Sequence, residues 1–181
     1  MSRVSLPAVD TAPEASRPAL AEIQTAFGAT PNMFRAVANS PAALKAMWSF
    51  FGALGGGTLG SRLGEQIAVA VADRNRCHYC LAAHTALGRK AGASAEEMAE
   101  AQAGRSADPR TAAALAFALK LVEERGGVDA ADVEALRAAG FDEGQVVEII
   151  AHVALNLFTN YINIALDTPV DFPQVKLRQA A

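Results

Sequence analysis

The sequence has 181 residues, and its 16 Lys and Arg against 19 Asp and Glu give a formal net charge of −3. A chain of this length fits one domain and buries a sizeable core without disulfide staples. The charge balance excludes a basic field, so nucleic acid and anionic membranes are poor candidate partners. Hydrophobic residues make up 51% of the chain, much of it alanine, which favours closely packed helices over sheets.

Two stretches bear on whether the chain enters a membrane or a secretory route. The first ten residues carry one Arg and no apolar core, so they do not form a secretory signal. The most apolar late stretch, 146–164, contains Glu148, His152 and three Asn. A bilayer span does not hold that polar load without special partners. We therefore expect a soluble, cytoplasmic protein.

Helix start and stop signals divide the chain into helices joined by short loops. The start signals are Ser, Thr, Asp or Pro before an apolar-periodic run, and the stop signals are Gly or polar breaks. In chain order we predict an extended arm over 1–13, a helix over 14–27, a short helix with Thr30 as N-cap, and a helix from Ser40 to about Leu54. The next helices run from Ser61 to the polar run 73–76 and from Cys77 to about Lys90, and two more begin at Ser94 and at Asp108. The last two run from Asp129 or Ala130 to about Gly140 and from Asp142 to about Ile164, and an irregular tail follows Pro169.

The fold class follows from this pattern. No run of alternating β-branched residues occurs, so the sequence predicts an all-α helical bundle. We expect a single domain over 1–181. An N-terminal arm and helices would cover 1–39 and C-terminal helices 126–168, on either side of a core over about 40–125 that a resemblance to a known family implies.

Only two cysteines occur, and they are three positions apart in Cys77-His78-Tyr79-Cys80. A structural disulfide stabilises a chain by closing a long loop, and this pair closes almost none. In a reducing compartment such a pair indicates redox or metal chemistry. A thiolate at a helix N-terminus is stabilised by unpaired N–H groups and by the dipole, so its pKa falls. We therefore expect a redox-active pair at the start of a helix, with one sulfur more exposed than the other.

Two further side chains are candidates for the same site. His84 lies four positions after Cys80, which places its imidazole one helical turn along on the same face, where it can take or relay the thiol proton. Glu65 lies in an apolar stretch of the preceding helix and needs a partner if it is buried, and the His84 and Cys80 cluster is the nearest candidate. Arg74 and Arg76 precede the motif and either add positive potential or are simply solvated.

Each of these features also has a plain structural explanation. The cysteine pair is compatible with half of a zinc site completed by His78, His84 or His152, and with two small buried hydrophobes. His84 is compatible with an ordinary satisfied residue, and Glu65 with a solvated first-turn glutamate favoured by the dipole. Tyr79 fits either core packing or a hydroxyl near the sulfur.

Two sets of residues are interpreted as structural. Polar side chains in the late apolar helix are interpreted as buried hydrogen-bonding groups, and large apolar side chains before the glycine run as core or subunit interface. The first set is His152, Asn156, Asn160 and Asn163, and the second is Met47, Trp48 and Phe51.

The pattern Glu65-x(11)-Cys77-x-x-Cys80-x-x-x-His84 resembles the active-site signature of the AhpD-like (alkylhydroperoxidase D) branch of the carboxymuconolactone decarboxylase superfamily. Segments 30–36 and 156–163 are similar to segments of its peroxidase-related members. The resemblance implies an all-helical bundle with the Cys-x-x-Cys pair at the N-terminus of a core helix. It also implies a homo-oligomer, often a trimer or hexamer.

The resemblance further implies a thiol-dependent peroxidase without cofactor or metal, supplied with electrons by a dithiol or a thioredoxin-like donor. Carried over residue by residue, Cys80 would attack the hydroperoxide, Cys77 would resolve the product as a disulfide, and His84 with Glu65 would relay protons. One departure concerns Tyr79, which stands where the well-studied peroxidase of the family has a histidine, while His78 lies one position earlier. A tyrosine hydroxyl is a poor base at neutral pH.

The sequence therefore predicts a peroxidase that reduces alkyl hydroperoxides or hydrogen peroxide. Two alternatives stay open: a protein disulfide reductase or redox adaptor, and a non-enzymatic zinc-binding or redox-sensing protein. Lactone decarboxylation is disfavoured, because the decarboxylases of the superfamily generally lack the cysteine pair.

Overall fold

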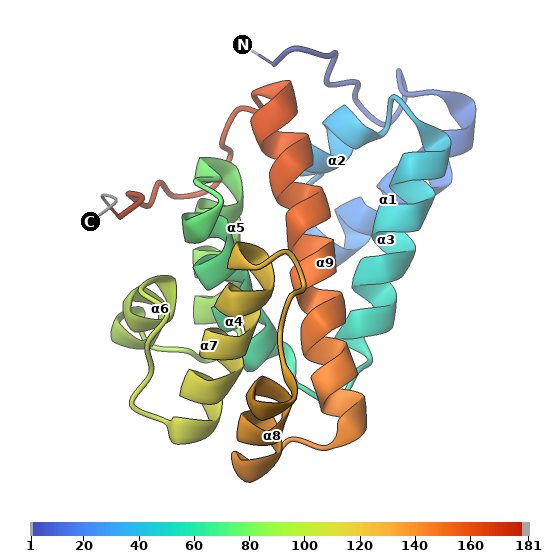
Figure 1. Cartoon of the computed structure of the whole chain (residues 1–181). Coiled ribbons are helices and arrows are strands. Elements are labelled where there is room, and N and C mark those ends of the chain that lie inside the picture. Colours follow the sequence, from blue (N-terminus) through green and yellow to red (C-terminus); the bar gives the residue numbers. More distant parts are fainter. Residues whose placement is uncertain (1, 179–181) are drawn as a thin grey trace.

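The computed structural model describes residues 2–178, and within that range it contains helices and no strand (Figure 1), as predicted. The elements are a 3-10 turn η1 (Glu14–Ser16) and the helices α1 (Arg17–Phe27), α2 (Asn32–Val37), α3 (Pro41–Gly55), α4 (Ser61–Arg74), α5 (His78–Lys90), α6 (Ala95–Gln102), α7 (Pro109–Glu123), α8 (Ala130–Ala138) and α9 (Glu143–Leu166).

Most of the predicted helix starts are confirmed by cap geometry. A side-chain oxygen accepts a backbone N–H of the first turn in five helices, and Ser94, Asp129 and Asp142 form full capping boxes. The other two oxygen caps are Ser40 of α3 and Asp108 of α7.

Two boundaries were predicted wrongly. Thr30 does not cap α2, because the N-cap is Pro31 and the helix begins at Asn32. The first predicted helix is split, with residues 14–16 in a 3-10 turn and the α-helix starting only at Arg17. Pro18 explains the split, since it lacks the N–H that would bond to the carbonyl of Glu14 in a continuous α-helix.

The helices α4 and α9 form the centre of the bundle. α4 packs against α5, α6, α7 and α9, and α9 also packs against α2, α3, α5, α7 and α8. In Figure 1, α9 runs through the middle of the molecule, with α3 on one side and α6, α7 and α8 on the other. The irregular tail after α9 passes beside the start of α5.

By length and composition alone α9 is the one helix within residues 2–178 that could cross a bilayer. Its place in the bundle gives another explanation. It carries the buried side chains of Asn156, Asn160 and Asn163, and it packs against helices on several sides. An apolar helix with buried amides that contact other helices is the core helix of a helical bundle.

The close contact of α4, α5 and α6 positions the functional side chains. A Cβ added at Gly88 of α5 would lie 3.3 Å from the Cβ of Glu65 and 2.4 Å from the Cε of Met98. A side chain at this position would push against Met98 and Glu65, so glycine favours the close approach of α5 to α4 and α6. The apolar side chains of α4, such as Ile67 and Val71, are fully buried.

Candidate functional site

The two cysteines lie at the N-terminus of α5, as predicted, and both are free thiols. Arg76 adopts a left-handed conformation with φ 59°, which reverses the chain after α4, and the Cys77 N–H then donates to the Ala72 carbonyl at 2.9 Å. Cys77 is the N-cap residue, and its sulfur accepts the backbone N–H of Cys80 at 3.3 Å. The pair is therefore built from a helix cap, which fixes both sulfurs without a long loop.

The expectation of one exposed and one deeper sulfur is wrong. Cys77 is 1% exposed and Cys80 is 2% exposed, so burial does not distinguish them. What distinguishes them is the space that each lines. Cys80 lines an apolar cavity of about 30 Å³, whereas Cys77 lines a separate cleft of about 370 Å³.

The structure brings Glu65 of α4 and His84 of α5 into direct contact. The His84 Nδ1 lies 2.7 Å from the Glu65 Oε2, and the two side chains are 11% and 21% exposed. A carboxylate can only accept here, so the imidazole Nδ1–H donates to it and Nε2 stays available for a thiol or a substrate. Burial lowers the pKa of His84, but the charge and hydrogen bond of Glu65 outweigh it, and the net pKa is raised above 6.5.

Cys80 is the more acidic of the two thiols. Burial acts to raise its pKa, but the hydrogen bond from Cys77, the charge of His84 and the amide of Asn163 together lower the pKa from 9.0 to about 7. Cys77 shifts the other way, because its hydrogen bond to Cys80 and its burial both raise the pKa of its thiol. The arrangement therefore holds a thiolate at Cys80 and a neutral thiol at Cys77.

Arg74 and Arg76 are not the source of this positive potential. Arg74 forms an ion pair with Glu123 on α7, and Arg76 is exposed. The charge that stabilises the Cys80 thiolate comes from His84 instead.

Asn163 of α9 is a site residue that sequence reasoning did not identify as one. Its side-chain Nδ2 donates to the Cys80 Sγ at 3.2 Å and to the Thr159 carbonyl at 3.0 Å. Asn160, whose Oδ1 accepts from Asn75 at 2.9 Å, adds a smaller lowering of the Cys80 pKa. The signal was the run of amides in an apolar helix, which we interpreted only as structural.

Tyr79 has a structural contact in place of a contact to sulfur. Its ring is buried and packs edge-to-face against Phe172 of the C-terminal tail, with ring centroids 5.8 Å apart. Its hydroxyl accepts the backbone N–H of Met33 at 3.2 Å, which anchors the start of α2. Burial and the nearby Asp171 carboxylate raise the pKa of the Tyr79 hydroxyl, so it is not a base at neutral pH.

His78 and His152 lie at the margin of the site. His78 is exposed and lines the cleft at Cys77. His152 packs against Gly64, where an added Cβ would lie 2.9 Å from its Cε1, and burial lowers the pKa of its imidazole. Asn156 donates to the His152 carbonyl at 2.8 Å within α9, which is the structural role predicted for it. Across residues 2–178, no group of three or more His, Cys, Asp or Glu side chains is arranged to hold a metal ion.

The cavity at Cys80 is lined almost entirely by apolar and aromatic side chains. Phe34 is its central ring and stacks edge-on against Trp48 and Phe51, with centroids 5.8 Å apart in each pair. The predicted apolar stripe of α3 therefore belongs to the core and forms part of the wall. The lining residues are Phe27, Pro31, Met33, Phe34, Phe51, Tyr79, Cys80, Ala83, His84, Leu87 and Phe172.

Comparisons with known proteins agree with this fold. The chain matches the carboxymuconolactone decarboxylase family over residues 41–124. A solved structure of an uncharacterized peroxidase-related protein with an alkylhydroperoxidase AhpD core, from Ralstonia eutropha JMP134, is 32% identical, and the match covers 94% of this chain and 92% of that one with a TM-score of 0.81. The chain belongs to the carboxymuconolactone decarboxylase family, in its AhpD-like branch.

Other solved structures show the same AhpD-like fold. An uncharacterized peroxidase-related protein from Silicibacter sp. TM1040 is 26% identical, with 93% of this chain and 91% of that one covered and a TM-score of 0.82. The debrominase Bmp8 in complex with 2,3,4-tribromopyrrole is 20% identical, with 94% of each chain covered and a TM-score of 0.79, which shows the fold alone. A search of curated proteins finds no match.

Proposed function

We propose that this AhpD-like protein is a thiol-dependent peroxidase that reduces alkyl hydroperoxides or hydrogen peroxide. The observation that supports this most directly is the setting of Cys80, whose thiol has a pKa of about 7 and receives a hydrogen bond from Asn163. The Glu65–His84 pair lies beside it. A thiol whose pKa is lowered to about 7, next to an imidazole whose pKa is raised, provides the nucleophile and the acid that peroxide cleavage requires.

The reaction has two covalent steps in this proposal. The Cys80 thiolate attacks the terminal oxygen of the hydroperoxide, the O–O bond breaks, and the His84 imidazolium protonates the leaving alkoxide. Cys80 is then a sulfenic acid. The Cys77 thiol attacks that sulfur, a disulfide forms, and water leaves. A dithiol or a thioredoxin-like donor reduces the disulfide, so that one hydroperoxide and two thiols become an alcohol, water and a disulfide.

The two spaces at the sulfurs suit different partners. The apolar cavity at Cys80 has a volume of about 30 Å³, enough for a small group such as the terminal oxygen of a hydroperoxide. An organic chain longer than this needs Phe172 or another wall residue to move. The wider cleft at Cys77 is lined by polar side chains that include Arg76, His78 and Asp167, and it suits a reducing thiol.

The function is tested by mixing the reduced protein with hydrogen peroxide, tert-butyl hydroperoxide or cumene hydroperoxide in the presence of dithiothreitol. We expect peroxide consumption with turnover, and without reductant we expect each chain to lose the mass of two hydrogen atoms as the disulfide forms. Disulfide reduction of a model protein without any peroxide consumption would instead favour the reductase alternative. A stoichiometric zinc content in protein purified without chelator would favour the metal-binding alternative.

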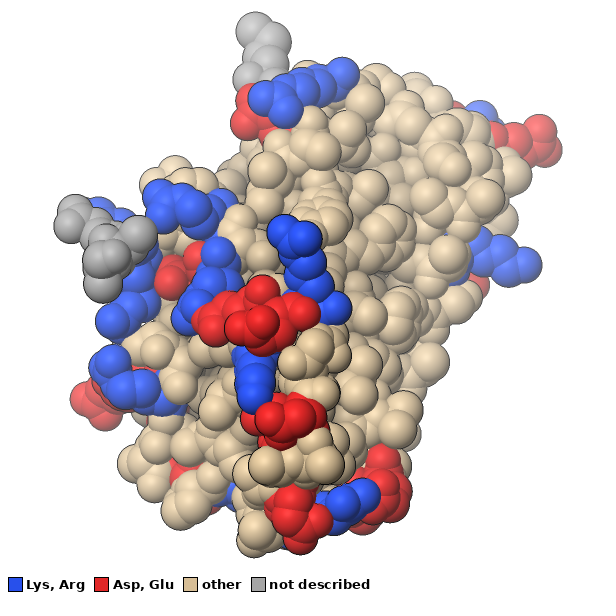
Figure 2. Space-filling view, in the orientation of Figure 1, with Lys and Arg blue, Asp and Glu red and all other residues tan. Residues whose placement is uncertain are grey.

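We also propose that the protein works in the cytoplasm as a homo-oligomer, with α9 at the interface. Four large apolar side chains of α9 are exposed, namely Val147 at 64%, Ile150 at 42%, Tyr161 at 62% and Ile164 at 45%. Figure 2 shows few charged side chains over α9 and α3, whereas Lys, Arg, Asp and Glu gather over α6, α7 and α8. A contiguous apolar face on a helix is typical of a protein interface.

The double substitution of Ile150→Lys and Tyr161→Lys tests this interface. Two buried charges would oppose association, so we expect the mass measured by light scattering after size exclusion to fall to that of one chain. Ala99→Lys, at an exposed position of α6, is the matched control and should leave the mass unchanged. A wild-type protein that is already a single chain at micromolar concentration would contradict the proposal.

A further inference from the structure

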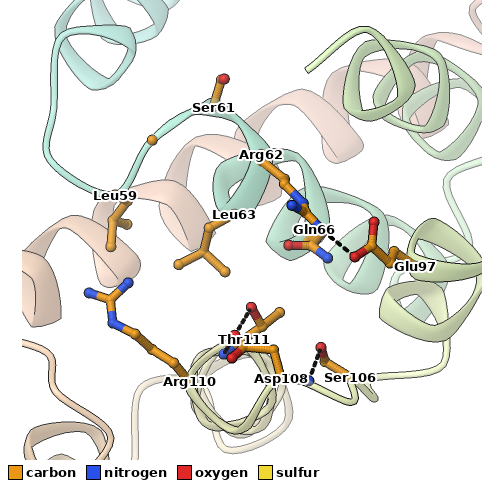
Figure 3. Close-up of a pocket in the computed structure, with 11 residues that line it drawn as sticks. Leu59, Ser61, Arg62, Leu63, Gln66, Glu97, Ser106, Asp108, Arg110 and Thr111 are labelled. Carbon is orange, nitrogen blue, oxygen red and sulfur yellow. Dashed lines mark hydrogen bonds and ion pairs between the residues drawn. The ribbon is translucent and has the colours of Figure 1, made fainter. Parts of the chain in front are cut away.

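A second cleft lies between the first turns of α4 and α7 (Figure 3) and shares no lining residue with the two spaces at the cysteines. Its volume is about 520 Å³, which is in the range of small-molecule sites. The lining residues are Leu59, Gly60, Ser61, Arg62, Leu63, Gln66, Glu97, Ser106, Asp108, Arg110 and Thr111.

The N-terminus of α4 opens onto this cleft without a capping side chain. Its N-cap residue is Gly60 at φ 79°, a conformation that favours glycine, so no side-chain oxygen is available there. The backbone N–H groups of Ser61, Arg62 and Leu63 make no hydrogen bond to any residue in 2–178. Three unpaired donors and the positive end of the helix dipole therefore belong to residues that line the cleft.

Gln66, one turn further along α4, provides a second and independent indication of a ligand. The residue is only 4% exposed, yet its side-chain amide has no hydrogen-bond partner among residues 2–178. Figure 3 shows this amide facing the space between α4 and α7. The polar atoms of this amide are accessible from the cleft and not sealed inside the core, so the unpartnered amide is available to a group that binds there.

Arg110 of α7 places a fixed positive charge at the wall of the cleft. Its guanidinium lies 4.0 Å from the centroid of the Phe141 ring and donates to the Gln145 Oε1 at 2.9 Å. Because one face of the guanidinium stacks on the Phe141 ring, the remaining N–H groups of Arg110 are held in one orientation.

The other charged groups of the cleft are already engaged with each other or with backbone. Glu97 pairs with Arg62 and accepts the backbone N–H of Ser94 at 2.7 Å. Asp108 accepts from the backbone N–H and the hydroxyl of Thr111 at 2.8 and 2.7 Å. The groups left without partners in the cleft are therefore mainly donors.

From these observations we propose that the cleft binds the phosphate or carboxylate group of a small molecule. The oxyanion accepts the N–H groups at the start of α4 and is contacted by Arg110, while the amide of Gln66 donates to an oxygen of the same group. This site does not depend on the redox chemistry at the cysteines, because no side chain is shared.

The proposal is tested by titrating ¹⁵N-labelled protein with inorganic phosphate and, separately, with acetate, at an ionic strength held constant with sodium chloride. We expect saturable shifts of the backbone amides of residues 61–63 and of the Gln66 side-chain amide. The amide of Asp132, which Asp129 caps at the start of α8, should not move. Saturation by one anion or by both supports the site and identifies its chemistry, whereas shifts no larger than with sodium chloride alone overturn it.

Two variants and a matched control locate the binding energy. Gln66→Leu and Arg110→Gln should each weaken binding of the effective anion by about tenfold or more, since a hydrogen bond to a charged group is lost. Arg105→Gln, which removes an exposed guanidinium bonded to Glu100, should leave the affinity unchanged. Circular dichroism checks the fold of each variant. Equal affinity in wild type and in the folded variants would overturn the proposal. If Gln66→Leu does not fold, Arg110→Gln tests the proposal on its own.

Discussion

Replacing Cys80 with serine should lower the rate of peroxide reduction by on the order of 10³-fold or more, which is the largest effect we expect. A serine hydroxyl stays protonated at neutral pH and is a poor nucleophile toward an O–O bond. The variant also loses the thiolate that His84 and Asn163 stabilise. The measurement is peroxide consumption at about pH 7 with excess dithiothreitol, after subtraction of the rate without protein.

Cys77→Ser is the matched partner of this variant and should behave differently. It keeps the Cys80 thiolate, so it should react once with peroxide and accumulate a sulfenic acid that dimedone traps. It has no resolving thiol, so the intramolecular disulfide cannot form. Equal loss of the first reaction in both variants, or trapping of a sulfenic acid at Cys77 in the Cys80→Ser protein, would contradict the proposed division of roles.

Replacing Glu65 with glutamine should have the second-largest effect, a loss of about 10²-fold at pH 7. Glutamine keeps a hydrogen bond to His84 but removes the charge that raises the pKa of the imidazole. The neutral imidazole no longer stabilises the Cys80 thiolate, so the pKa of that thiol moves back toward 9.0. At pH 7 the thiolate fraction then falls below about half, and the acid that protonates the alkoxide is also lost.

The pH dependence separates this mechanism from general damage to the fold. Because the thiolate is the reactive form and its pKa is lowered to about 7, the wild-type rate should rise as the pH increases through about 7. It should fall again at higher pH, where the His84 imidazolium that protonates the alkoxide loses its proton. In Glu65→Gln the midpoint should move upward, so that raising the pH to about 9 restores part of the rate. Glu100→Gln, an exposed glutamate paired with Arg105, is the control and should keep the wild-type profile. An unchanged midpoint in Glu65→Gln would show that His84 does not transmit the charge of Glu65 to Cys80.

The sequence by itself determined the elements of this protein. Oxygen caps such as Ser40, Ser94 and Asp108 leave a local chemical signal, because a short side chain satisfies unpaired N–H groups of the next turn. The cysteine pair at the start of α5 is equally local, since Cys77 is itself the cap. A predicted helix boundary was wrong where the helix-start signal was ambiguous, as at Thr30 and Pro31, two adjacent residues that both favour a helix start.

The tertiary structure decided what those elements do together. The contact between Glu65 and His84 depends on the close packing of α4 on α5 at Gly88, and the three-residue break after α4 sets a geometry that no spacing rule predicts. The donation from Asn163 to Cys80 joins residues 83 positions apart, so it exists only because α9 crosses the start of α5. The sequence left Tyr79 open between core packing and a hydroxyl near the sulfur, and only the structure shows that its hydroxyl bonds to Met33 on another helix. Local propensity fixes helices and caps, whereas the pKa of a buried thiol depends on charges and amides that only the packing of distant segments brings within a few ångströms.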